Sequence, residues 1–421
     1  MQKYLKYKKK YLALKRGGAE LLIVKRTQLF NKFIEKGTLT IDEIVELPDI
    51  IFNEFANRDK KGNITLKTLH EDDIKHIKEL MESGMRLSSS WLRDSFIEKI
   101  LSYKQAIALP VAEHHNVIEI NDIRSIEDLR NLSSTFSNLR KITFNFFFND
   151  VISINDFNNL KGTEAELPNF SLKEIEFGNQ FNNGGQPLDA GFLPTGLTHL
   201  TFDRSFNQPL TAEVLPRTLT HLTFDRSFNQ PLTAEVFPRT LTDLTFGYDF
   251  NQPLVAGVFP ATLINLTFGA KFDQPLTKGV LPEGLTDLTF GTFFNQLLTK
   301  GVLPTTLTHL TFDVFGNFNQ LLTKGVLPEG LTDLTFGGFN QSLTTEVLPT
   351  TLTHLTFGYK FNNGGQPLAT GVLPAGLTHL TFSYGFNNGG QPLATGVLPA
   401  GLIKFVWPNF VHNNRLIFKP T

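Results

Sequence analysis

The chain has 421 residues, and its 39 lysines and arginines nearly cancel its 40 aspartates and glutamates. This balance excludes a protein that binds nucleic acid through overall positive charge. The absence of cysteine excludes disulfide bonds and thiolate zinc sites. No apolar run approaches the ~18 residues of a membrane-spanning helix. We therefore expect a soluble, intracellular protein.

The first 18 residues form a basic segment. Residues 1–16 carry seven lysines and arginines and no acidic residue, and Gly17 and Gly18 follow them. Tyr4, Tyr7 and Tyr11 recur at spacings of three and four, as on one side of a helix. One interpretation is a short solvated helix. The other is a basic amphipathic segment that contacts an anionic membrane or nucleic acid, the only part of the chain for which we expect such a contact.

Residues 19–135 are predicted to form a second, mostly helical domain. A helix is expected from Thr68 to Gly84, where a capping residue precedes apolar residues at helical spacing and a glycine follows them. Another is expected through residues 91–104. A connector then reaches Ile118, and residues 125–135 are expected to form the last helix, which shields the first strand of the following array.

The rest of the chain is dominated by a repeated segment, which first appears in full as LTHLTFDRSFNQPLTAEVLPRT at Leu197. Five of the eight intervals between its close copies are 22 residues long, and a fixed period of this length indicates a solenoid. We count twelve units over residues 139–410, with atypical first and last units, and we assign residues 411–421 to a C-terminal cap or tail. The close copies begin at Leu197, Leu219, Leu241, Leu263, Leu285, Leu307, Leu331, Leu352 and Leu377.

Each unit is predicted to contribute one parallel strand. In LTHLTF the residues alternate between apolar and polar side chains, which indicates a strand with one buried face. About 22 residues leave too little chain for an antiparallel return, and the proline in each VLP segment argues against a long helix on the outer side. The phenylalanine four residues after the strand predicts a second buried column. The asparagine that follows it predicts a ladder of amides that pair with turn backbone.

The pattern L-T-x-L-T-F-x-x-x-F-N-Q-P-L-x-x-x-V-L-P resembles the FNIP repeat, a leucine-rich-repeat-like unit of slime-mould and giant-virus proteins. The resemblance implies a solenoid of leucine-rich-repeat type. Together with the helical domain expected before it, the fold class is predicted as α+β, a helical domain followed by a parallel β-solenoid. It also implies the host cytoplasm as the location if the protein is viral. Three units insert residues as FNNGGQPL, at Asn182, Asn362 and Asn387, and these insertions are expected to lengthen a turn without changing the strand register.

Some proteins with this repeat also carry an F-box, a helical module that docks on the ubiquitin-ligase subunit Skp1. A degenerate F-box is expected near residues 47–60, where Leu47, Pro48, Ile51 and Phe52 would make the contact with a Skp1-like adaptor. The alternative is an ordinary helix start, because a Leu-Pro pair often precedes a helix.

The exposed strand positions are the expected binding face of such an array. The third strand position varies, whereas the fifth is threonine in all nine close copies, including Thr201 and Thr223. Adjacent histidines suggest metal ligands, but no third ligand stands at a suitable spacing, so the other interpretation is solvated polar residues on a sheet face. The variable residues are His199, His221, Asp243, Asn265, Asp287, His309, Asp333, His354 and His379.

No catalytic motif stands out, and we expect no cofactor, no metal and no small-molecule substrate. The favoured function is a non-enzymatic scaffold that binds a protein partner through the strand face of the solenoid. One alternative is a substrate receptor of a Skp1-type ubiquitin ligase. The other is a structural or particle-associated protein held by its basic N-terminal segment.

Overall fold

The computed structural model describes residues 56–58, 64–66, 99–111, 114, 117–132, 136, 138–153, 156–157 and 172–407. The chain divides into two compact units, Met1–Ile118 and Glu119–Thr421. The basic segment, the four F-box-like residues and the predicted tail at 411–421 lie outside the described residues.

The described part of the first unit contains strands where the sequence predicted mainly helices. Strands β1 (Ala56–Arg58) and β2 (Ile64–Leu66) pair in antiparallel fashion. Strand β3 (Lys99–Ser102) replaces the end of the helix expected at 91–104, and a short helix α7 (Tyr103–Ile107) follows. The Gln105 side-chain oxygen accepts a hydrogen bond from the Ser102 N–H at 3.0 Å. This contact caps α7 at its first turn, so the helix begins only after the strand.

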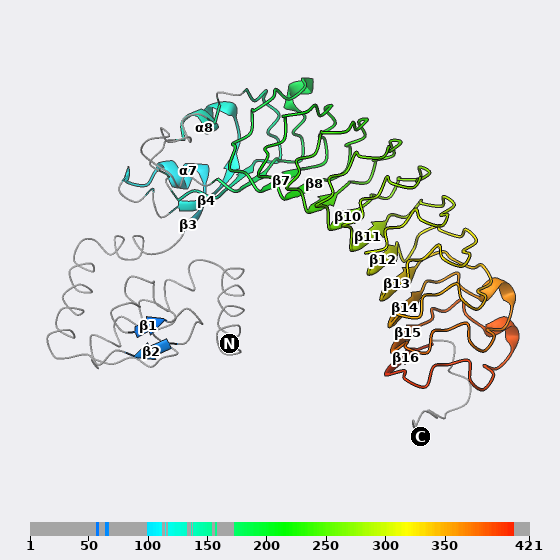
Figure 1. The fold of residues 1–421 in the computed structure, drawn as a ribbon. Coiled ribbons are helices and arrows are strands. Elements are labelled where there is room, and N and C mark those ends of the chain that lie inside the picture. Colours follow the sequence, from blue (N-terminus) through cyan, green and yellow to red (C-terminus); the bar gives the residue numbers. More distant parts are fainter. Residues whose placement is uncertain are drawn as a thin grey trace. The chain divides into compact units, whose positions relative to one another are not determined.

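The second unit is a curved stack of parallel strands, which Figure 1 shows along the inner side of the array. Each strand pairs with the strands of the preceding and following units, so the sequence order is also the order in the sheet. The strands are β4 (Val117–Ile123), β5 (Lys141–Phe144), β6 (Glu174–Glu176), β7 (His199–Phe202), β8 (His221–Phe224), β9 (Asp243–Thr245), β10 (Asn265–Thr267), β11 (Asp287–Phe290), β12 (His309–Phe312), β13 (Asp333–Phe336), β14 (His354–Phe357), β15 (His379–Thr381) and β16 (Lys404–Val406).

The parallel array begins one strand before the start predicted at Leu139. Strand β4 pairs in parallel with β5, with Glu119 opposite Lys141, although its sequence VIEINDI is not a copy of the repeat. The last predicted helix is shortened to α8 (Ile126–Arg130) and lies between β4 and β5 in the chain. It therefore follows the first strand of this unit, whereas we expected it to precede the array.

The interior of the solenoid consists of the columns predicted from the repeat. Phe202 stacks on Phe206 of its own unit at 3.9 Å between ring centroids, and Phe206 stacks on Phe228 of the next unit at 6.1 Å. The leucines of the repeat are equally buried, and Leu197 and Leu219, two positions before β7 and β8, have no exposed surface. Apolar burial of this kind contributes ~1.5–3 kcal/mol per side chain, so each added unit extends the core by one layer.

The asparagine ladder is also present. The Asn207 side-chain oxygen accepts a hydrogen bond from the Asn229 N–H at 2.9 Å, and Asn229 accepts in turn from Asn251. Asp273 takes the same place, since its carboxylate accepts from the Asn295 N–H at 2.9 Å. The following glutamine adds a second bond, from Gln230 Nε2 to the Asn207 carbonyl. The turn backbone is thereby paired from unit to unit.

The inserted FNNGGQPL segments lengthen the outer turn and preserve the register, as predicted. Each forms a short 3-10 helix: η3 (Asn183–Gly185), η4 (Asn363–Gly365) and η5 (Asn388–Gly390). The strands on either side of η4 still align His354 with His379. Between residues 172 and 407 the return segments otherwise contain turns and bends without an α-helix, in agreement with the proline in each VLP segment.

Candidate functional site on the strand face

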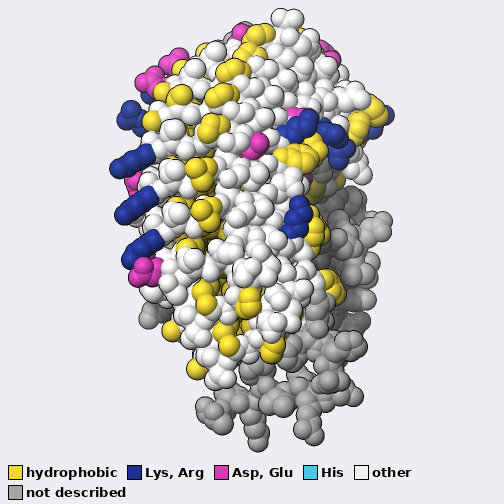
Figure 2. Space-filling model, turned by 90° about the vertical axis from the view of Figure 1, so that its right-hand side faces the viewer, with side chains coloured by type: hydrophobic (Ala, Val, Ile, Leu, Met, Phe, Trp, Pro, Cys, Tyr) yellow, Lys and Arg dark blue, Asp and Glu magenta, His cyan; other side chains and the backbone are white. Residues whose placement is uncertain are grey.

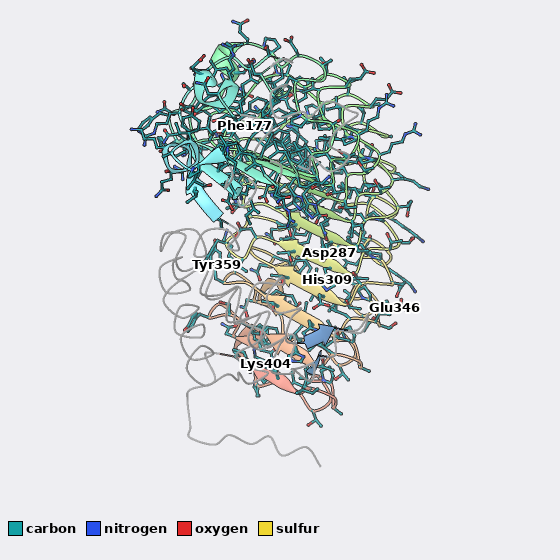
Figure 3. All side chains as sticks on the ribbon, turned by 90° about the vertical axis from the view of Figure 1, so that its left-hand side faces the viewer. Phe177, Asp287, His309, Glu346, Tyr359 and Lys404 are labelled. Carbon is teal, nitrogen blue, oxygen red and sulfur yellow. The ribbon has the colours of Figure 1, made fainter. Side chains whose placement is uncertain are left out.

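The variable residues at position three of each repeat form one continuous column across β7 to β15. The sheet register places His199 opposite His221, His221 opposite Asp243, and so on to His379. Figure 3 shows Asp287 and His309 on neighbouring strands, with Tyr359 and Glu346 on opposite sides of the row of strands. All nine predicted variable residues therefore lie on one surface, and Lys141 and Glu174 continue the column at its beginning.

Neighbouring side chains in this column contact each other. The rings of His199 and His221 stack at 4.1 Å, and those of His354 and His379 stack at 4.3 Å. Among the described residues no group of three or more metal-ligating side chains is present.

The carboxylates of the column lie beside the imidazoles. Asp243 lies 3.3 Å from His221 Nε2, and it also accepts a 2.6 Å hydrogen bond from the Asn265 amide. His309 has carboxylates on both sides, from Asp287 at 3.3 Å and from Asp333 at 3.5 Å. These contacts become ion pairs only when the ring is protonated.

Each histidine of the column has the hydroxyl of the preceding threonine beside its ring, a contact that the sequence did not reveal. The Thr220 hydroxyl donates to the Thr198 carbonyl at 3.0 Å, and its oxygen also lies 2.8 Å from His221 Nδ1. The hydroxyl thus lies between the ring and the backbone of the preceding strand. The same pair of contacts occurs at Thr198, Thr308, Thr353 and Thr378.

The electrostatic environment is most distinctive at the first histidine. Burial lowers the pKa of His199 below its ordinary value, and the neighbouring His221 lowers it further, because two stacked rings resist double protonation. At the start of the column, burial opposes the charge of Lys141, but the hydrogen bonds that Lys141 donates to Glu174 and Glu176 outweigh it, so the pKa of Lys141 is raised.

The fifth strand positions form a second column of half-buried threonines beside the first. Thr201 lies opposite Thr223, and the alignment continues through Thr381. The opposite side of the array is different: Figure 2 shows hydrophobic side chains in a column and a row of lysines and arginines at one border, with no histidine among the described side chains in view. The histidine and carboxylate column thus distinguishes the strand face from the outer surface.

A row of exposed aromatic residues, which the sequence did not reveal, lies in the turns after the strands. Phe315 and Tyr384 are 72% and 74% exposed, and the Phe315 ring lies 6.5 Å from the Tyr359 ring. Phe315 belongs to an insertion that makes its unit 24 residues long. That change in spacing was the available signal, since residues added to a turn must project outward when the strands keep their register.

The described part of the chain contains no helix that is long and apolar enough to cross a membrane.

Comparison with known proteins places these features in a family context. The family described as FNIP Repeat matches five times, over residues 185–227, 228–271, 272–313, 318–360 and 339–384. Among solved structures, the chain is similar to CroV588, described as a novel circular LRR protein, with 38% sequence identity and a TM-score of 0.57. That match covers 71% of this chain and 44% of CroV588, so the chain spans less than half of its length. No curated protein sequence matches the chain significantly. Residues 185–313 and 318–384 are therefore FNIP repeats, and they form part of a parallel β-solenoid of the leucine-rich-repeat type.

Proposed function

We propose that the protein is a non-enzymatic interaction scaffold whose solenoid binds a protein partner through the strand face. The observation that supports this most is the unbroken column from His199 to His379, in which polar side chains repeat at every strand on the inner side of a curved array. Solenoids of this kind use such extended inner surfaces for binding. The repeat fold is itself typical of interaction scaffolds.

A rigid backbone supports the same proposal. The column stands on strands whose following turns are joined by the asparagine ladder. The buried side of the same units is held by stacked phenylalanines. A preorganised surface loses little conformational entropy when a partner binds. The ubiquitin-ligase alternative depends on Leu47, Pro48, Ile51 and Phe52, outside the described residues, and it stays a prediction.

Proximity labelling in cells that express the full chain would test the proposal with two matched triple variants. One carries Asp243→Arg, Asp287→Arg and Asp333→Arg on the strand face. The other carries Glu235→Arg, Glu283→Arg and Glu329→Arg in exposed turns of the return segments. We expect the first variant to lose labelled partners that the second retains. Partners that survive equally in both variants, once folding is verified by circular dichroism, would contradict binding through the strand face.

A further inference from the structure

The strand face carries a net negative charge when its histidines are neutral. Between His199 and His379 the column consists of five histidines, three aspartates and one asparagine, so its formal charge in that state is −3. The carboxylates also accept hydrogen bonds, as Asp243 does from the Asn265 amide. A complementary partner therefore has to supply positive charge and hydrogen-bond donors at the carboxylates.

The three carboxylates are also evenly spaced. Asp243, Asp287 and Asp333 stand on β9, β11 and β13, so each is two strands from the next. Strands lie ~4.8 Å apart, and two intervals give ~9.6 Å. A polyproline II helix has three residues per turn at 3.1 Å each, so it repeats a side chain on the same side every ~9.3 Å. In a β-strand, by contrast, residues three apart point to opposite sides.

We propose that this column binds an extended, basic segment of a partner protein in the polyproline II conformation, with an arginine or lysine at every third residue. The inference deepens the proposed scaffold function and rests on it. Each basic side chain would meet one of the three aspartates. The residues between them would lie against the imidazoles, such as that of His309 between Asp287 and Asp333, and against the half-buried threonines of the fifth position.

The test uses the full chain and fluorescence anisotropy with labelled twelve-residue peptides. The spaced probe is (Arg-Pro-Pro)4, and its control has the same composition with four consecutive arginines followed by eight prolines. An acidic probe, (Glu-Pro-Pro)4, reports non-specific association. At pH 7.5 and low salt we expect the spaced probe to bind at least about tenfold more tightly than either of the others.

Matched variants locate the site. The triple variant Asp243→Asn, Asp287→Asn, Asp333→Asn removes three charges but keeps the oxygens that accept from Thr242, Thr286 and Asn265. It should lower the affinity for the spaced probe by about tenfold or more. The control Glu235→Gln, Glu283→Gln, Glu329→Gln removes three exposed charges elsewhere and should leave the affinity unchanged.

Three results overturn the inference: no binding of the spaced probe, equal binding of the clustered or acidic probe, or equal affinity in the two triple variants. If partners labelled in cells still depend on the strand face after such a result, only the basic-segment inference fails and the scaffold proposal stands. If that dependence is absent as well, both fail.

Discussion

The two sides of each strand differ in how much they vary from unit to unit. Towards the interior, leucine and phenylalanine recur with little change, whereas the third strand position changes among histidine, aspartate and asparagine. An interior phenylalanine stacks on its equivalents in both neighbouring units, so a change of size disturbs three layers at once. A side chain on the strand face also contacts its neighbours, but part of its surface is exposed to solvent. Packing therefore explains why the interior positions are uniform. Binding specificity can reside in the variable positions of the strand face.

The largest expected effect tests the uniform side. Phe250 has no exposed surface, stacks on Phe246 at 3.9 Å and lies between Phe228 and Phe272. Phe250→Ala should lower the free energy of unfolding by ~3–5 kcal/mol, since it removes the ring and leaves a cavity. Urea unfolding followed by circular dichroism measures this. Phe315→Ala, at a 72% exposed ring, serves as the control and should cost no more than ~0.5 kcal/mol. Similar losses in both variants would refute the distinction between interior and surface.

The ladder should show an intermediate effect. The Asn251 side-chain oxygen accepts from the Asp273 N–H at 2.9 Å and from Gln274 Nε2 at 3.0 Å. Asn251→Ala leaves both donors without this acceptor and should lower the free energy of unfolding by ~1–3 kcal/mol. Asn251→Asp retains an acceptor, as Asp273 does naturally, and should cost clearly less. Thermal unfolding of the two variants measures this difference. Equal destabilisation by both substitutions would show that the side-chain acceptor contributes nothing to stability.

The smallest effect concerns the strand face and depends on pH. The folded-state pKa of His199 is lowered, mainly by burial and secondly by His221. The unfolded chain therefore binds the proton first as the pH falls, and stability that is present above the unfolded pKa of ~6.5 is lost as the pH falls through the folded value. Between pH 7.5 and 5.5, the melting temperature of the wild-type protein should fall more than that of His199→Gln. An identical decrease would show that this ring does not contribute.

Much of the fold could be predicted because the repeat is a local signal. Alternation in LTHLTF defines the buried side of each strand, and the constant period forces consecutive strands to be parallel neighbours. Strand β4 could not be predicted in this way, because VIEINDI carries no copy of the repeat. Its pairing with β5 adds a strand to the sheet without a copy of the repeat, and that pairing is set by tertiary structure. Strand β3 was predicted as part of a helix for a similar reason, because Ile100 and Leu101 fit both the helical and the strand periodicity.

The nine residues of the strand face could be identified from the sequence, but their chemistry could not. Position three of the repeat is enough to assign them to one column. The contacts of these residues, such as the stacking of His199 on His221 and the Thr220 hydroxyl beside His221 Nδ1, are visible only in the structure.

The sequence by itself thus determined the period, the buried columns and the asparagine ladder, since each follows from residues within one unit and the repetition of that unit. Only the tertiary structure decided where the array begins, how the insertion at Phe315 projects, and which groups contact the His221 ring. The physical reason is the same in each case. Such properties depend on contacts between units, in which a hydroxyl, a carboxylate or a strand edge is supplied by the next layer of the solenoid.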